Sequence, residues 1–553
     1  MKKNGAVILI EMLEMHGITE LTGIPGGSIL PVYHALSGSK IRHILARHEQ
    51  GAGFIAQGMA RSTGRPAVCI TTSGPGATNL VTVLADAKSD SVPIIAITGQ
   101  VSQSLIGTDA FQEVDICSIA KPVVKKVFQI KSVADIPDKI NEAFHLAVSG
   151  RPGPVLIDIP KDIQLSEIEI ENISGYSICN SQEKKIHLRD IEKIASMIKE
   201  SNRPILYTGG GIINAGASKK LKELAEKNHI PVVTTLMGLG SFPAKDPLFL
   251  GIPGMHGTRS TNLSLHKADL LLAFGVRFDD RVTGKVNAFC LDAKVVHIDI
   301  DSSEIGKIRK PDFSIACNVK PLLEALIPIV ERNERIEWLK EIAFYKEKFG
   351  KKMPDTSNIF HPVNFIKTIC SFASADTIIT TDVGQHQMWV AQHYEFSKPR
   401  TLLTSGGQGT MGFGLPAAIG AALANPDKNV IAFCGDGSLL MNIQELATLA
   451  DLGADVHILV MNNGHLGLVR QQQELFYAKN YFASSFETKV NYTEAAKAFG
   501  IRAYDLNSCE QPLELLENAL REPGPNLINV PIESELNVYP IVPPGASNVM
   551  MIG

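Results

Sequence analysis

Residues 429–469 constrain the fold of this chain more than any other stretch. They read NVIAFCGDGSLLMNIQELATLADLGADVHILVMNNGHLGLV. A first apolar run ends at Gly435, a helical pattern follows, and a second apolar run ends at Asn462. This succession of strand, turn, helix and strand predicts a βαβ unit with two parallel strands. Their carboxyl ends then lie side by side, and open α/β sheets bind ligands at such ends.

Residues that offer oxygen ligands follow both predicted strands. Asp436 follows the first strand and Asn463 follows the second. The helix expected from near Leu439 adds backbone N–H groups and the positive end of its dipole, which favour an anion. Either segment alone would be interpreted as an ordinary turn or loop. Together they predict a site for Mg²⁺ with a diphosphate, because Mg²⁺ prefers oxygen ligands.

The same alternation of apolar runs and helical patterns continues through most of the chain. At 553 residues the chain is too long for one hydrophobic core. We therefore predict an α/β protein with three doubly wound parallel-sheet domains. Their expected bounds are residues 1–165, 188–352 and 362–553, the last with a C-terminal tail. Polar, weakly periodic stretches at residues 166–187 and 353–361 are expected to be linkers.

Composition excludes several classes of protein. The net charge of −4 gives no reason to expect a nucleic-acid partner. The N-terminal apolar run is interrupted by Glu11 and Glu14, so it is expected to be a helix and not a signal peptide. No segment approaches the roughly 18 apolar residues of a membrane span. The eight cysteines have no paired spacing, which indicates reduced thiols and a cytoplasmic protein.

Glu49 has two possible roles. It follows the apolar run IRHILA and opens a predicted helix whose first turns carry Gly51, Ala52, Gly53 and Ala56. A carboxylate at this position can simply complement the helix dipole. Alternatively, because small neighbours allow a ring to approach closely, it is a buried acid that hydrogen-bonds a nitrogen heterocycle.

Several longer motifs favour the second interpretation of Glu49. The GDG…NN pair and RHEQGAGFIAQGMAR resemble the metal-binding and pyrimidine-binding segments of thiamine diphosphate enzymes. GMHGTRSTN and FGVRFDDRVTGK resemble the central domain of acetohydroxyacid synthases, also called acetolactate synthases. TSGPGATN, TDAFQEVDI, PGPVLIDIPKD and SGGQGTMGFG agree, so the resemblance covers the chain from GIPGG to VPPGA. QQQ at 471–473 and the ending VYPIVPPGASN resemble the large catalytic subunit of the bacterial isozyme I type.

The resemblance implies the fold of the thiamine diphosphate enzymes and residues that bind this cofactor. Glu49 would protonate the aminopyrimidine ring at N1′. Mg²⁺ would be bound by Asp436, Asn463 and the backbone carbonyl of His465. The remaining positions implied for thiamine diphosphate are Val383, Gly384, Gln385, His386, Gly409, Met411, Gly435, Gly437, Ser438 and Gly467.

A second cofactor, FAD, is implied for the central domain. The sequence alone favours ordinary turns there, since GGGIINAG misses the GxGxxG spacing and the acidic DID at 299–301 suits ribose only loosely. The family usually has Asp where this chain has Asn318, although an amide can still hydrogen-bond adenine or ribose. The positions implied for FAD are Arg151, Gly209, Gly210, Gly211, Thr234, Leu236, Met255, His256, Gly275, Arg277, Arg281, Val282, Asp299, Ile300 and Asn318.

The implied activity is that of an acetolactate synthase, a transferase of EC class 2.2.1.6. Pyruvate is decarboxylated on thiamine diphosphate, and the hydroxyethyl unit is ligated to pyruvate or 2-oxobutanoate. This is the first common step of isoleucine and valine biosynthesis. Gln472 replaces a Trp that favours 2-oxobutanoate in most of the family, which suggests freer use of pyruvate, unless the exchange is neutral. The implied catalytic and substrate-pocket residues are Glu49, Gly26, Gly27, Phe111, Gln112, Lys161, Arg281 and Gln472.

Three alternatives share the fold or its sites. An FAD-dependent pyruvate oxidase or a simple 2-oxoacid decarboxylase would have the same fold. An FAD-free catabolic acetolactate synthase would form the same product. The third alternative is an inactive scaffold that only binds the cofactor. The joint presence of Glu49, Asp436 and Asn463 argues against it. The resemblance also implies a homodimer or homotetramer with active sites between subunits, a small regulatory subunit, and no nucleic-acid or membrane partner.

Overall fold

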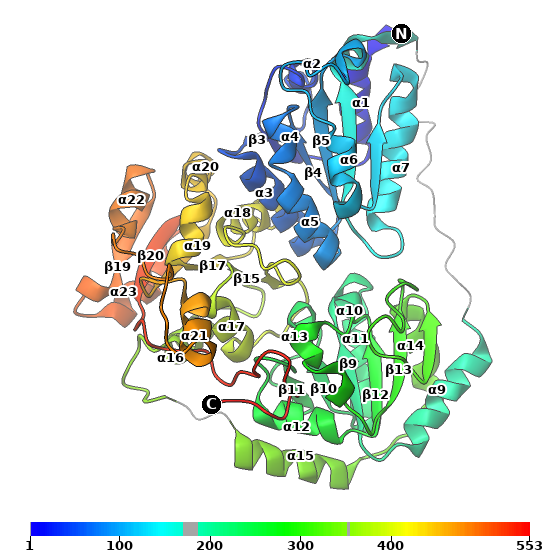
Figure 1. The fold of residues 1–553 in the computed structure, drawn as a ribbon, viewed down its shortest axis with the longest axis vertical. Helices are drawn as coiled ribbons and strands as arrows, with labels where there is room; N and C mark the ends of the chain where they lie inside the picture. The colour runs from blue at the N-terminus through cyan, green and yellow to red at the C-terminus, as the bar shows by residue number, and fades with distance from the viewer. Residues whose placement is uncertain (1, 170–185, 351–353) are drawn as a thin grey trace.

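The chain forms three α/β units, each built on a six-stranded sheet flanked by helices (Figure 1). This computed structural model describes residues 2–169, 186–350 and 354–553. Most of the predicted linker at 166–187 lies outside the described residues, and so does the first residue of the predicted linker at 353–361. The predicted fold class, three parallel-sheet α/β units, is confirmed.

The first unit has the strand order β3-β2-β4-β5-β7-β6, with every neighbouring pair parallel. Strands such as AVCIT and IIAITGQ are buried along their whole length because helices cover both faces of a parallel sheet. The strands are β2 (Glu20–Gly23), β3 (Arg42–Leu45), β4 (Ala67–Thr71), β5 (Ile94–Gln100), β6 (Lys126–Gln129) and β7 (Val155–Pro160). The helices are α1 (Gly5–Met15), α2 (Leu30–Leu36), α3 (Glu49–Thr63), α4 (Pro75–Thr78), α5 (Val81–Asp90), α6 (Ile116–Ala120), α7 (Ile136–Val148) and α8 (Lys161–Leu165).

A small antiparallel pair lies beside this unit. It joins β1 (Lys2–Asn4) to β8 (Glu167–Glu169). The first residues of the predicted linker therefore pair with the N-terminus of the described chain.

The second unit has the order β11-β10-β9-β12-β13-β14, which is the 3-2-1-4-5-6 order of dinucleotide-binding sheets. The order reverses between β9 and β12, and ligands bind such sheets at that point. The strands are β9 (Pro204–Thr208), β10 (Val232–Thr234), β11 (Phe249–Gly251), β12 (Leu270–Phe274), β13 (Lys294–Asp299) and β14 (Phe313–Ala316). The helices are α9 (Leu188–Glu200), α10 (Gly210–Asn214), α11 (Ser218–Asn228), α12 (Arg259–Lys267), α13 (Asp280–Thr283), α14 (Val319–Ile329) and α15 (Ile336–Phe349).

The third unit has the order β16-β15-β17-β18-β20-β19, which repeats the order of the first unit strand for strand. Its strands are β15 (Ile378–Thr381), β16 (Leu402–Leu403), β17 (Val430–Gly435), β18 (Val456–Asn462), β19 (Arg502–Asp505) and β20 (Asn526–Pro531). Its helices are α16 (Pro362–Phe372), α17 (Gln385–His393), α18 (Gly414–Ala424), α19 (Asp436–Leu439), α20 (Glu445–Leu452), α21 (Gly467–Phe476), α22 (Tyr492–Ala498) and α23 (Pro512–Arg521).

The βαβ unit predicted at residues 429–469 is confirmed, with one difference. β17 and β18 are parallel neighbours, but the connecting helix begins at Asp436, not near Leu439, and is interrupted after Leu439. The interruption coincides with Asn442, whose side-chain amide donates to the carbonyl oxygen of Gly412 at 2.7 Å. A polar side chain bonded outside the helix thus divides the connection into α19 and α20.

The first and third units pack together through α3 and α18, which lie side by side in Figure 1. Small residues allow this close approach. A Cβ added at Gly58 would lie 2.1 Å from the carbonyl oxygen of Ala417, and one at Gly420 would lie 1.9 Å from that of Ile55. Gly58, on the helix that Glu49 opens, therefore serves helix packing. Among the described residues, no helix is long and apolar enough to cross a membrane.

Candidate functional site

Asp436 lies where β17 ends and is almost fully buried. Its Oδ1 accepts a hydrogen bond from the backbone N–H of Gly437 at 2.9 Å, and its Oδ2 accepts one from Gly464 at 2.7 Å. Because Gly464 follows β18, this carboxylate connects the ends of two adjacent parallel strands. Burial raises the pKa of Asp436 to about 6, and a bound cation would favour the ionised form.

Asn463 lies beside Asp436 in the loop after β18. Its Oδ1 accepts a hydrogen bond from the N–H of His465 at 3.0 Å, and its Nδ2 donates to Oε1 of Gln385 at 3.1 Å. The amide oxygen keeps a second lone pair for a cation. One carboxylate, one amide oxygen and the nearby backbone carbonyls fit Mg²⁺. No group of three or more His, Cys, Asp or Glu that could hold a metal occurs among the described residues.

The buried ring of His386 lies next to these ligands and offers a nitrogen to an anion. A Cβ added at Gly384 or Gly435 would lie 2.7 Å or 2.9 Å from its ring, so glycine is required at both positions. Within the described chain its buried Nε2 has no hydrogen-bond partner, and burial lowers the pKa of the imidazole to about 3. A diphosphate would satisfy this nitrogen, and its negative charge would raise the pKa again.

Two further glycines keep the neighbouring turns close-packed. A Cβ at Gly437 would lie 2.7 Å from the ring of Phe486. A Cβ at Gly467 would lie 2.1 Å from Oε1 of Gln385. The hydroxyl of Ser438 accepts a hydrogen bond from the N–H of Gly435 at 3.1 Å. The predicted diphosphate residues thus form one connected set at the carboxyl ends of β15, β17 and β18.

Gln471 extends this set to the C-terminal segment. Gln385 Nε2 donates to Oε1 of Gln471 at 3.0 Å and to the carbonyl oxygen of Leu536 at 2.9 Å. Gln471 is fully buried and exchanges two hydrogen bonds with the backbone of Val538, at 2.8 Å and 3.0 Å. Gln385 therefore orients the amide of Asn463, and Gln471 connects Gln385 to the C-terminal segment at Val538.

Several predicted residues of the first unit lie at the carboxyl ends of β2, β3 and β4. Glu49 opens α3 and is half-buried, and its Oε2 accepts a hydrogen bond from Nδ2 of Asn79 at 2.9 Å. A Cβ at Gly26 would lie 2.5 Å from the side chain of Thr72, whereas Gly27 has open space beside it. Gln112 has a φ of 59° and lies against Gly74.

Other predicted residues of the first unit face solvent in this single chain. Phe111 is 87% exposed, and Lys161 begins α8 with its side chain partly exposed. The Glu49 carboxylate accepts its hydrogen bond from Asn79, a residue of the same unit. We call the surroundings of Glu49 in the first unit and those of Asp436 and Asn463 in the third unit the two half-sites.

A cavity of about 750 Å³ lies between the three units. It is at the carboxyl ends of β9, β12 and β13, where the order of the second sheet reverses. Gly209 and Thr234 are outside the lining set. The predicted FAD positions that line it are Arg151, Gly210, Gly211, Leu236, Met255, His256, Gly275, Arg277, Arg281, Val282, Asp299, Ile300 and Asn318.

The polar groups of this cavity fit a large polar ligand. Within the described chain, Tyr207 Oη and His256 Nδ1 are buried without a hydrogen-bond partner. Burial lowers the pKa of His256 to about 4 and raises that of Asp299 to about 6. Arg151 pairs with Glu304 at 2.8 Å and donates to Oγ of Ser91 at 2.8 Å, so it links the first and second units at one end of the cavity.

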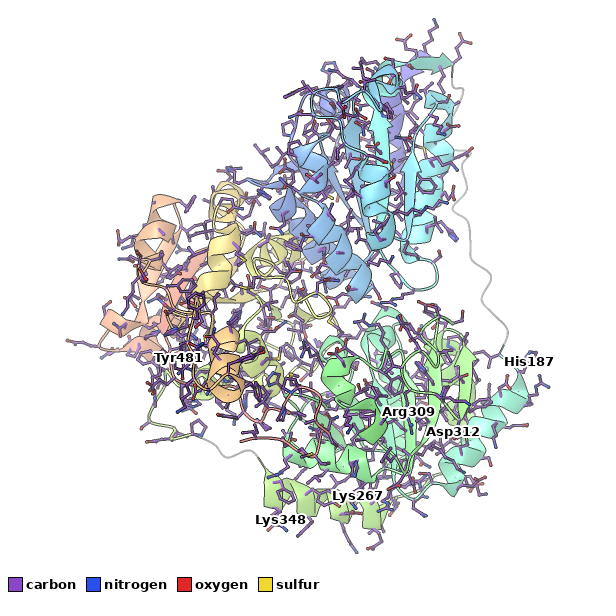
Figure 2. All side chains as sticks on the ribbon, viewed as in Figure 1. His187, Lys267, Arg309, Asp312, Lys348 and Tyr481 are labelled. Carbon is purple, nitrogen blue, oxygen red and sulfur yellow. The ribbon has the colours of Figure 1, made fainter. Side chains whose placement is uncertain are left out.

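The third unit closes the other end of the cavity. Val383, Gly409 and Gln472 line it there, together with Arg281 from the second unit. Gln472 lies on α21, which is held by the ion pair of Arg470 with Glu474 at 3.0 Å. Figure 2 shows Tyr481 on the segment after this helix, where its ring lies 5.2 Å from the guanidinium of Arg470.

The sequence pattern does not identify several of the lining residues. Tyr207 is inside an apolar strand, and Met237 and Met388 resemble core residues, so nothing in the pattern distinguishes them. Glu304 carried a weak signal, since it follows the acidic DID. The lining residues missed in this way include Tyr207, Met237, Glu304, Gln387, Met388, Leu468 and Gln471.

Comparison with families of known proteins assigns all three units. Residues 3–119 match the N-terminal TPP binding domain of thiamine pyrophosphate enzymes. Residues 191–326 match the central domain of these enzymes, and residues 382–530 match their C-terminal TPP binding domain.

Relatives align over nearly the whole chain. The acetolactate synthase isozyme 1 large subunit of Escherichia coli K12 is 52% identical, over 99% of this chain and 97% of its own length. The chloroplastic acetolactate synthase of Arabidopsis thaliana is 46% identical, over 99% of this chain and 84% of its own length. The acetolactate synthase large subunit of Corynebacterium glutamicum is 44% identical, over 99% and 90%.

Proposed function

The chain belongs to the acetolactate synthase large subunits within the thiamine pyrophosphate enzymes, and we propose that it forms acetolactate from two molecules of pyruvate. It would also accept 2-oxobutanoate as the second 2-oxoacid. The observation that carries the proposal is 52% identity over 99% of the chain to an acetolactate synthase large subunit. The joint presence of Glu49, Asp436 and Asn463 supports an active member of the family. The step would begin the synthesis of branched-chain amino acids.

Each residue of the two half-sites would have a distinct task. Bound thiamine diphosphate supplies the electron sink that decarboxylation of a 2-oxoacid needs. Asp436 and Asn463, with the carbonyl of His465, would hold Mg²⁺ and thereby fix the diphosphate. Glu49 would hold a proton at N1′ of the aminopyrimidine. Arg281 would pair with the carboxylate of the second 2-oxoacid, because guanidinium matches carboxylate geometry.

FAD would occupy the cavity between the units. The 3-2-1-4-5-6 strand order, the volume of about 750 Å³ and the two buried polar atoms without partners support this. Asn318 accepts a hydrogen bond from the N–H of Lys320 at 3.0 Å and also lines the cavity, so the amide is compatible with a nucleotide there. The flavin would have a structural role in the main reaction.

A second copy of the chain would complete each active site. Among the described residues, the Glu49 carboxylate bonds to Asn79 of its own unit, and Phe111 of the same unit is 87% exposed. We infer a homodimer or homotetramer in which Phe111, Gln112, Lys161, Gly26 and Gly27 of one subunit face the cofactor bound by another. Several relatives are named large subunits, which supports a smaller regulatory partner.

The activity is tested by incubating the purified protein with pyruvate, thiamine diphosphate and Mg²⁺ under nitrogen. We expect acetolactate without any added oxidant, and FAD among the small molecules released by heat. A pyruvate oxidase would need an electron acceptor, and a simple decarboxylase would release acetaldehyde instead. Acetolactate formation without bound FAD would identify the FAD-free type of synthase and contradict the flavin assignment.

The side chain at position 472 should influence the choice of second substrate. Gln472 and Arg281 line the same cavity, and an indole at position 472 would add apolar surface for the extra methyl group of 2-oxobutanoate. One methylene in an apolar pocket changes selectivity by roughly 10-fold. With both oxoacids present, Gln472→Trp should therefore shift the product ratio about 10-fold towards acetohydroxybutanoate.

Gln472→Ala is the control, because it removes bulk without adding an aromatic ring. Its product ratio should stay near that of the unchanged protein. Equal ratios for all three proteins would show that this position does not contact the acceptor.

A further inference from the structure

Three buried charges join the first unit to a glycine-rich loop of the third unit, outside the half-sites described above. Asp86 and Asp90 lie one turn apart on α5, and both accept a hydrogen bond from Nη2 of Arg61, at 2.7 Å and 3.0 Å. All three side chains are buried. We call Arg61, Asp86 and Asp90 the ion cluster.

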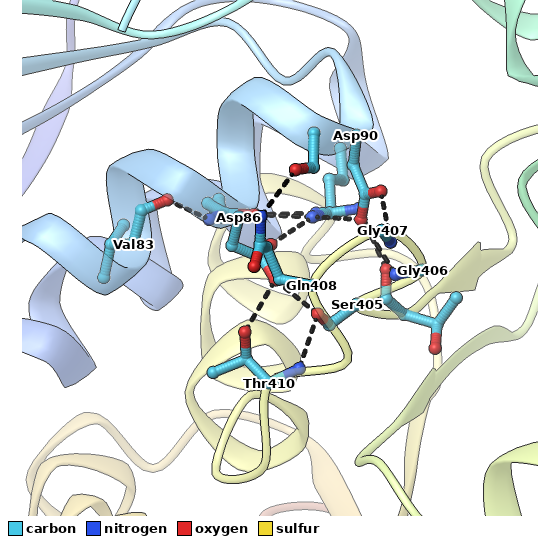
Figure 3. Close-up of polar contacts among 12 residues, drawn as sticks. Val83, Asp86, Asp90, Ser405, Gly406, Gly407, Gln408 and Thr410 are labelled. Atoms are coloured by element: carbon cyan, nitrogen blue, oxygen red, sulfur yellow. Dashed lines mark hydrogen bonds and ion pairs between the residues drawn. The ribbon is translucent and has the colours of Figure 1, made fainter. Parts of the chain in front are cut away.

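The ion cluster binds the loop of residues 405–410 almost residue by residue (Figure 3). Asp90 accepts the backbone N–H groups of Gly406 and Gly407 at 2.9 Å and 2.8 Å. Asp86 accepts the hydroxyl groups of Ser405 and Thr410, the latter at 3.0 Å.

Two more contacts complete the attachment. Arg61 donates through Nη1 to the carbonyl oxygen of Thr404 at 2.9 Å. Nε2 of Gln408 donates to Oγ of Ser89 at 2.9 Å. Each residue of the segment 404–410 apart from Gly409 therefore makes a hydrogen bond to the ion cluster or to Ser89 on α5.

The other side of the same loop faces the cofactor sites. Ser405, Gly406 and Gly409 line the cavity. A Cβ at Gly406 would lie 2.4 Å from Sδ of Met237, and one at Gly407 would lie 3.4 Å from the guanidinium of Arg277. The loop continues directly into Met411. Asp90 of the ion cluster lines the same cavity. The loop thus lies between the ion cluster and the residues proposed to contact thiamine diphosphate.

A loop of this composition does not hold its shape by itself. Gly406, Gly407 and Gly409 have no side chains to pack, and glycine has more backbone freedom than any other residue. The attachment also carries a cost, since two buried carboxylates share one guanidinium. Burial raises the pKa of Asp86, and its bonds to Ser405 and Thr410 favour the ionised form. The loop and the ion cluster therefore supply each other's hydrogen-bond partners.

We propose that Arg61, Asp86 and Asp90 are positioning residues that hold residues 405–411 in the conformation that thiamine diphosphate requires. The proposal rests on the proposed function, since it assumes that Gly409 and Met411 contact this cofactor. The ion cluster itself does not touch the reacting atoms. Its loss should weaken cofactor binding more than it slows the fully loaded enzyme.

The test compares Asp90→Ala, Asp90→Asn and Thr410→Val in the full-length protein. Asp90→Ala removes both acceptors of the loop N–H groups, whereas Asp90→Asn keeps one carbonyl oxygen. Thr410→Val removes one donor of the loop and leaves the ion pair of Arg61 with Asp86 intact, so it remains informative if the Asp90 variants do not fold. The matched control is Asp451→Asn, because the Arg47–Asp451 ion pair also joins the first and third units but the Asp451 side chain is largely exposed.

Two measurements report on the loop directly. Calorimetric titration with thiamine diphosphate and Mg²⁺ should give a dissociation constant about 10-fold higher for Asp90→Ala and a smaller rise for Asp90→Asn and Thr410→Val. Hydrogen exchange of residues 405–411 in cofactor-free protein should be faster in these variants. Acetolactate formation at saturating cofactor should stay within about twofold of the unchanged protein. Asp451→Asn should match the unchanged protein throughout.

Unchanged affinity and exchange in the folded Asp90 and Thr410 variants would overturn the proposal. A loss of saturated rate with unchanged affinity would also overturn it. If the unchanged protein binds thiamine diphosphate but makes no acetolactate, the proposed function fails while the exchange comparison still decides the role of the ion cluster.

Discussion

Asp436→Ala is expected to abolish Mg²⁺-dependent binding of thiamine diphosphate. Asp436 is the carboxylate at the proposed metal site, and its two oxygens already connect the turn after β17 to the loop after β18. Changes to residues that merely support metal ligands cost roughly 10- to 100-fold in affinity, so loss of a direct ligand should cost at least about 100-fold. Calorimetric titration of the metal and cofactor together would measure this.

Two neighbouring asparagines provide a matched comparison for this result. Asn463 faces the proposed metal and is bonded to Gln385, whereas Asn462 donates to Oδ1 of Asn529 on β20 at 3.1 Å. Asn463→Ala should reduce Mg²⁺ affinity strongly, and Asn462→Ala should leave it nearly unchanged. Equal affinities for the two variants, or full affinity in Asp436→Ala, would contradict the metal assignment.

The sequence predicts the parts of this site that lie within one βαβ unit. Asp436 and Asn463 follow two strands that pair directly, so the pattern alone brings them together. Glu49 could be recognised as the first residue of a helix, but no local pattern states which surface completes its site. Its proposed role follows from the resemblance, not from spacing.

Contacts between the units could not be predicted from the sequence. Asp86 and Asp90 have the spacing of an ordinary acidic helix face, and their loop partners lie more than 300 residues further along the chain. Gln385 and Gln471 are polar residues on two helices, and only the packing of α17 against α21 and the tail explains their burial. Such partners depend on how the units pack, which hydrophobic periodicity does not encode.

Glu49→Gln should remove nearly all acetolactate formation while cofactor binding persists. Glutamine has nearly the same shape and can still accept the hydrogen bond of Asn79, but it cannot hold a proton that it exchanges with the aminopyrimidine ring. Loss of a general acid or base typically costs about 10²- to 10⁴-fold in rate. Rates at saturating thiamine diphosphate, with the dissociation constant measured separately, would distinguish lost chemistry from lost binding.

Asn79→Ala is the graded control, because it removes the residue that orients the carboxylate and leaves the acid in place. Its rate should fall between those of the unchanged protein and Glu49→Gln. Near-normal turnover by Glu49→Gln would exclude this residue as the acid of the site.

The same variant also tests whether two subunits share each site. If Glu49 of one subunit serves the Asp436 half-site of another, a mixed dimer of Glu49→Gln and Asp436→Ala subunits has one site with both residues intact. Random exchange of subunits between two inactive preparations should then restore about a quarter of the normal rate. If both residues belonged to one chain, every site in the mixture would lack one of them, and the mixture would stay as inactive as its components.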